Sequence, residues 1–186
     1  MSKQKKKNRR AYLNDFRLGE NGEYSYAGAE YTPIPKNGKS VKRAFLEITS
    51  ITAICTFLSV LGGCIPSAGM LNCFYVIIPF ICEIASVVSV LWIVCRMMYH
   101  GFPLREYIYT ATAEKLTDRC RFPMIFSVLG LVCTVIYVFL NGFDNQTYVT
   151  LIYLLLKISI FLLFFILKRL SNEITWKKTT VSLMNE

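Results

Sequence analysis

The sequence contains none of the short motifs that mark the common enzyme classes. It has no Walker A sequence, no His-Glu-x-x-His and no Gly-x-Ser-x-Gly, so nothing indicates nucleotide hydrolysis, zinc proteolysis or serine hydrolysis. The single histidine, His100, has no Ser/His/Asp set or metal-ligating cluster around it in the sequence. Acid–base catalysis needs positioned partners. We therefore expect a protein that is not an enzyme, with no cofactor and no metal site.

The seven cysteines include no Cys-x-x-Cys pair. This absence argues against a membrane disulfide oxidoreductase and against a zinc ribbon. Most of the cysteines lie inside apolar runs, where a free cysteine behaves as a small hydrophobic residue. Cys64 and Cys73 differ, because both are predicted near the outer ends of neighbouring helices. A disulfide between them is one alternative, and two free thiols are the other. Because a disulfide forms only within a narrow range of geometries, two free thiols are favoured.

Basic residues are missing from two of the connections between the apolar runs. Of the 21 lysines and arginines, 20 lie in residues 1–43, in residues 96–122 or in the segment after the last apolar run. Because positive charge collects on the cytoplasmic side of a membrane protein, this asymmetry places both termini in the cytoplasm. The net charge of +9 then indicates contact with anionic lipid headgroups rather than with nucleic acid.

Long apolar runs, in contrast, dominate the chain. Of its 186 residues 54% are hydrophobic, and the mean hydropathy is +0.42. A bilayer core needs about 20 apolar residues per helix, and four runs meet this need, at about residues 44–65, 73–95, 123–140 and 148–167. We predict an all-α membrane protein with four transmembrane helices in an up-down bundle over residues 44–168. Since no apolar stretch directly follows the basic start, no cleavable signal peptide is expected, and the first run is an anchor in the plasma membrane.

Three polar segments flank these runs. Residues 1–43 form a basic, partly disordered cytoplasmic segment, in which the Asn21-Gly22 step predicts a β-hairpin over residues 12–26. Residues 32–39 indicate an extended linker. The cytoplasmic loop 96–122 has apolar residues at near-helical spacing, which predicts a short amphipathic helix on the inner membrane face. Residues 169–186 form a polar cytoplasmic tail.

Two ionisable residues lie in the middle of apolar runs. Glu83 precedes Arg96 by 13 residues, and Lys157 precedes Lys168 by 11. At about 1.5 Å per residue their depths differ by only about 3 Å, which a lysine side chain can bridge. We predict an intramembrane ion pair between the second and fourth helices. It either fixes the helix register, or serves a proton or ion path, or docks a partner helix.

Two further polar residues are predicted near the inner interface. Glu47 lies about one turn inside the first helix, and His100 lies just beyond the end of the second. Near helix ends such side chains can reach headgroups, so both are interpreted as interfacial polar residues.

Two functions remain open. The chain is either an accessory or assembly subunit of a membrane complex, or a small oligomeric transporter or channel that uses Glu83 and Lys157. Four helices with a central glutamate resemble the plan of the small multidrug antiporters. In that family, however, the essential carboxylate lies in the first helix, and there is no long basic N-terminal segment. The mostly Leu, Ile and Phe composition of the fourth run favours the accessory role, with a membrane protein or a second copy of the chain as partner.

Overall fold

The computed structural model describes residues 16–18, 24–26, 28–36, 38, 40–67, 73–142 and 147–180. Four of its helices are long and apolar enough to cross a membrane. They are α1 (Val41–Cys64), α3 (Phe74–His100), α6 (Arg121–Asn141) and α7 (Thr147–Asn172). Each lies where an apolar run predicted a helix. The helix α3 continues five residues past the predicted end at residue 95, and α7 continues five past residue 167.

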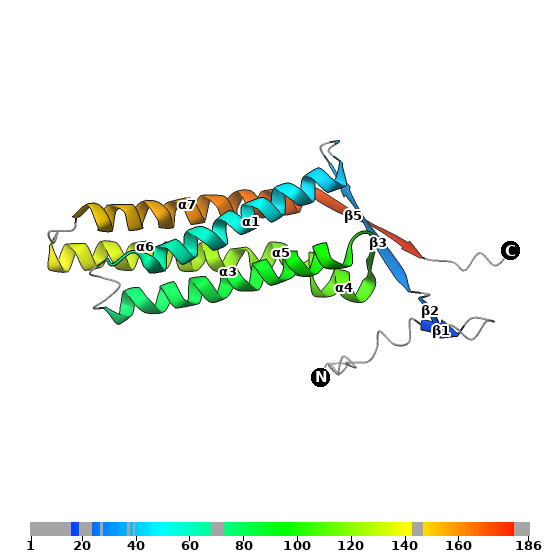
Figure 1. Cartoon of the computed structure of the whole chain (residues 1–186), viewed down its shortest axis with the longest axis horizontal. Coiled ribbons are helices and arrows are strands. Elements are labelled where there is room, and N and C mark those ends of the chain that lie inside the picture. Colours follow the sequence, from blue (N-terminus) through cyan, green and yellow to red (C-terminus); the bar gives the residue numbers. More distant parts are fainter. Residues whose placement is uncertain are drawn as a thin grey trace, which may run out of the picture.

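The four long helices lie side by side and form what we call the bundle (Figure 1). The helix α1 packs against α3 and α7, and α6 also packs against α3 and α7. The order around the bundle is therefore α1, α3, α6, α7. This order places α3 and α7 on one diagonal, so that side chains from these two helices can meet at the centre.

The buried residues of each long helix follow a heptad pattern, in which the spacing alternates between three and four residues. In α1 they are Phe45, Ile48, Thr52, Cys55, Ser59 and Gly62, and in α7 they are Tyr153, Lys157, Ile160, Phe164 and Leu167. This spacing is typical of helices that pack with a small left-handed crossing angle. The outward faces carry exposed Leu, Ile, Val and Phe side chains, as expected of surfaces that contact lipid.

The described part of the chain is mostly helical, consistent with the predicted all-α membrane protein, and two small sheets lie at one end of the bundle. The strands β1 (Phe16–Leu18) and β2 (Tyr24–Tyr26) form the antiparallel hairpin expected within residues 12–26. The strand β3 (Ala29–Pro35) pairs with β4 (Leu104–Arg105) on one side and β5 (Ile174–Thr180) on the other. The predicted linker and the predicted tail therefore each contain a strand, because the backbone groups of β3 and β5 hydrogen-bond to each other.

An aromatic cluster joins this three-stranded sheet to the bundle. The ring centroid of Trp176 on β5 lies 6.2 Å from that of Phe45 on α1 and 5.2 Å from that of Tyr109. The Tyr109 ring stacks in turn on Tyr31 of β3, at 3.9 Å. Such ring pairs stabilise a contact beyond the apolar area that they bury. These contacts hold the sheet against the end of the bundle where α1 begins and α7 ends.

The loop between α3 and α6 holds two short helices in place of the single amphipathic helix that was predicted. They are α4 (Glu106–Ala111) and α5 (Ala113–Arg119), separated by Thr112, whose φ of −124° and ψ of −79° interrupt the helix. Ile108 and Leu116 are buried in the same hydrophobic core as Phe45 of α1. The two helices therefore close the end of the bundle core that lies next to the three-stranded sheet.

Candidate functional site

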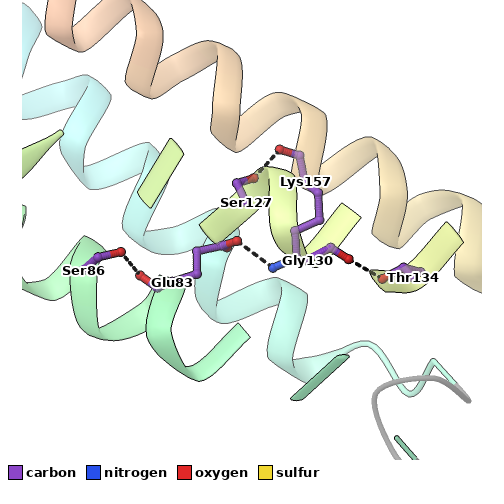
Figure 2. A network of polar contacts seen from close by, with 6 residues as sticks. All are labelled: Glu83, Ser86, Ser127, Gly130, Thr134 and Lys157. Carbon is purple, nitrogen blue, oxygen red and sulfur yellow. Dashed lines mark hydrogen bonds and ion pairs between the residues drawn. The ribbon is translucent and has the colours of Figure 1, made fainter. Parts of the chain in front are cut away.

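Glu83 and Lys157 lie against each other in the interior of the bundle. The Nζ atom of Lys157 lies 2.9 Å from Oε2 of Glu83, and the lysine and glutamate side chains are 1% and 0% exposed. At this distance the ammonium group donates a charge-assisted hydrogen bond to the carboxylate. Figure 2 shows Lys157 reaching from α7 towards Glu83 on α3. The structure thus brings together the two residues that were predicted to pair.

The helices place both residues at one depth. Glu83 comes nine residues after the start of α3, and Lys157 comes ten residues after the start of α7. Both helices begin at the same end of the bundle, so the two Cα atoms lie about 14 and 15 Å along their axes. Each residue also occupies a buried heptad position. Because α3 and α7 are diagonal partners, the pair crosses the centre of the core.

Two aromatic rings complete the surroundings of the ammonium group. The Nζ atom of Lys157 lies 4.7 Å from the ring centroid of Phe80 and 5.0 Å from that of Tyr153. Phe80 precedes Glu83 by three residues and Tyr153 precedes Lys157 by four, so each ring lies one helical turn towards the start of its helix. The negative ring faces attract the cation in a site without bulk water. The rings therefore favour a cation at position 157 over an anion.

The helix α6 lies directly beside the lysine stem. A carbon in the Cβ position of Gly130 would lie 3.6 Å from Cε of Lys157, which is ordinary van der Waals contact. Three residues earlier, the Ser127 hydroxyl donates a hydrogen bond of 2.7 Å to the backbone carbonyl of Lys157 (Figure 2). Small residues and hydroxyl groups allow membrane helices to approach closely. The α6 backbone and Ser127 thus fix the part of α7 from which Lys157 extends.

One oxygen of the pair has no partner. Oε1 of Glu83 is buried and accepts no hydrogen bond from any described protein group, and the same is true of Oγ of Ser59 on α1. A buried polar atom without a partner lowers stability. A buried ion pair of this kind is therefore weak evidence for stability and better evidence for a specific arrangement of helices.

The other predicted site residues lie outside this centre. Glu47 is 31% exposed, with Oε1 3.8 Å from Nε of Arg43. His100 is the last residue of α3, and its exposed ring contacts Tyr99 edge-on at 5.3 Å. Both lie towards the end of the bundle that carries the three-stranded sheet.

The cysteines are free thiols, so the disulfide considered between Cys64 and Cys73 is not formed. Within the described ranges, no group of three His, Cys, Asp or Glu side chains could hold a metal ion.

Sequence reasoning missed the residues that surround the pair. Phe80, Tyr153 and Gly130 were not singled out, because aromatic and small residues are common in any apolar run. The heptad spacing carries the signal that could have found them. A residue three or four positions before a buried charge shares its face of the helix, which identifies Phe80 and Tyr153.

These features define the class of the protein. The four long apolar helices, with an ion pair buried among them, make this chain an integral membrane protein with four candidate membrane spans. No family model, curated protein or solved structure matches the chain.

Proposed function

We propose that this protein is a non-enzymatic accessory or assembly subunit of a complex in the plasma membrane, with both termini in the cytoplasm. The observation that carries this proposal is the β-sheet at the inner end of the bundle. It joins the segment before α1 to the segment after α7. The strand before α1 and the strand after α7 therefore form one platform, as a subunit that presents a docking surface requires.

The edge of that sheet is where a partner fits. Among the described strands, the seven-residue β5 pairs along one edge only, with β3. An unpaired strand edge is a template for an added strand from another chain. Lys177 and Lys178 on β5 are exposed, so the edge favours a partner segment with acidic side chains.

The buried pair supports the same proposal. Lys157 and Glu83 neutralise each other and are at most 1% exposed, so bulk water and ions do not reach them in this conformation. A pair held in this way fits a role in fixing the neighbours of α3 and α7.

The accessory role is tested by purifying the tagged chain from its native membrane in mild detergent and measuring the mass of the complex. A second protein in fixed ratio is the expected result. A photo-crosslinker at Lys177 should capture that protein, whereas the same group at Phe139, 91% exposed on α6, should not. A lone monomer with no adduct at Lys177 contradicts the proposal.

The orientation has its own test. A chain whose only cysteine is Cys64, at the far end of α1, should react in intact cells with a membrane-impermeant maleimide. A cysteine-free chain with Lys177→Cys should react only after the membrane is permeabilised. The opposite pattern would reverse the proposed topology.

A small oligomeric transporter or channel is the second candidate. The unpartnered Oε1 of Glu83 favours it, because a carboxylate oxygen with no hydrogen-bond partner can accept a proton or ion in a second conformation that opens a path to the pair. In proteoliposomes this function predicts a flux that Glu83→Gln abolishes. A purified homo-oligomer with such a flux would replace the accessory proposal.

A further inference from the structure

An apolar groove with two cations at one end lies on the lipid-facing side of the bundle. It runs between α6 and α7 and has a volume of about 420 Å³. Its apolar wall includes Ile125, Val128 and Leu129 of α6, which are 54%, 44% and 45% exposed. These side chains lie within a candidate membrane span, so the groove faces the hydrocarbon of the bilayer.

The two cations come from different helices and lie at the same end of the groove. Arg121 is the first residue of α6, and Lys168 lies four residues before the end of α7. From Arg121 to Leu129 the wall extends eight residues, or about 12 Å, towards the middle of the bilayer. Cationic groups thus stand where headgroups lie, and apolar side chains stand where acyl chains lie.

From this arrangement we infer that the α6–α7 groove binds one anionic phospholipid of the inner leaflet, with its phosphate between Arg121 and Lys168 and an acyl chain along the wall. A planar guanidinium group and an ammonium group both donate hydrogen bonds to phosphate oxygens. The inference rests on the proposed orientation of the chain and goes beyond its role as an accessory subunit.

One carboxylate competes for this site. Oδ1 of Asp118 lies 3.4 Å from an Nη atom of Arg121, and the aspartate and arginine side chains are 69% and 59% exposed. An exposed ion pair of this kind contributes little, and a guanidinium group has further donors to offer a phosphate. Removing this carboxylate should therefore strengthen lipid binding.

The test uses the full chain in detergent and counts bound lipid by native mass spectrometry. The probes are phosphatidylglycerol and phosphatidylcholine with the same acyl chains. We expect the wild type to retain one phosphatidylglycerol in preference to phosphatidylcholine. Arg121→Gln with Lys168→Gln should reduce that preference by up to about twenty-five-fold, since each cation near the surface contributes about fivefold. Asp118→Asn should raise it.

The matched control makes the same change of charge outside the groove. Lys42→Gln with Arg43→Gln alters two exposed cations at the inner end of α1, and it should leave the preference unchanged. Val128→Trp fills the groove without a change of charge and should also abolish retention.

Three results would overturn the inference. They are no preference in the wild type, an equal loss in the α1 control, or full competition by inorganic phosphate, which would indicate an anion site with no role for the acyl chain. Because the measurement needs neither a partner protein nor an oriented membrane, its failure is separate from failure of the accessory role.

Discussion

Replacing Lys157 by methionine removes the ammonium group but keeps most of the side chain. The thioether can still fill the space beside Gly130, where a Cβ added to the glycine would lie 3.6 Å from the lysine stem, and it makes favourable contacts with the rings of Phe80 and Tyr153. The main change is that Glu83, 0% exposed, loses its partner. Removing one member of a buried ion pair costs about 3–5 kcal/mol. Lys157→Met should therefore lower the free energy of unfolding by that amount.

The reciprocal change, Glu83→Leu, leaves the ammonium group unpaired and should cost a similar amount. The double variant removes both charges from the core. Apolar residues of similar volume in place of a buried pair are neutral or stabilising by about 1–4 kcal/mol. If the two effects were independent, the double variant would instead lose about 6–10 kcal/mol, twice the cost of one unpaired charge. The structure predicts a coupling energy of at least about 6 kcal/mol, the difference between that additive loss and a neutral double variant.

The assay is unfolding in mixed micelles with rising denaturing detergent, followed by circular dichroism. The exposed pair Arg169–Glu173, at 3.7 Å with side chains 77% and 32% exposed, is the matched control. Its coupling should stay below about 1 kcal/mol. Additive losses at Glu83 and Lys157, with a coupling no larger than that of the control, would refute a direct buried interaction.

The charge swap Glu83→Lys with Lys157→Glu sharpens the test. It restores an ion pair, so it should be more stable than either single change. It also places a carboxylate where Lys157 now faces the rings of Phe80 and Tyr153, at 4.7 and 5.0 Å. Ring faces repel an anion, so the swap should remain less stable than the wild type. Recovery to full stability would show that the rings do not select the sign of the charge.

Three further predictions concern other parts of the chain. Gly130→Ala should be neutral or stabilise the chain slightly in thermal unfolding, since its Cβ meets Lys157 at ordinary contact distance and alanine favours helix; Gly130→Leu should lose about 1–3 kcal/mol through overpacking. Trp176→Ala should lower the free energy of opening of the three-stranded sheet by about 2 kcal/mol, less than for a fully buried tryptophan. Hydrogen exchange should become faster in β3 and β5, while the amides of the bundle stay protected. Oε1 of Glu106 lies 3.5 Å from Nζ of Lys178, and the negative carboxylate raises the pKa of Lys178. The stability that this pair contributes is therefore fully present below the ordinary lysine pKa and is lost as pH rises through the raised value. Glu106→Gln should lower the pKa of Lys178 in an NMR titration, and an unchanged value would contradict the contact.

The sequence by itself determined the four long helices and the presence of two charges deep within them. Hydrocarbon thickness sets the length of an apolar run, and the rise per residue sets depth along a helix. These are local properties, so no knowledge of the neighbouring helices was needed to compare the depths of Glu83 and Lys157.

Only the tertiary structure decided which residues surround that pair and how the ends of the chain fold. In a membrane helix both the core face and the lipid face are apolar, so hydropathy alone does not show that Phe80 and Tyr153 point inwards. Their spacing places each ring on the same helix face as one charge, but only the packing of α3 against α7 brings both rings to one ammonium group. The strand β3 pairs with β5, where Ala29 is the register partner of Thr180 from the opposite end of the sequence. Strand pairing of that kind depends on a distant partner rather than on local composition. The segments whose composition predicts a linker and a tail form a sheet because the bundle brings them together.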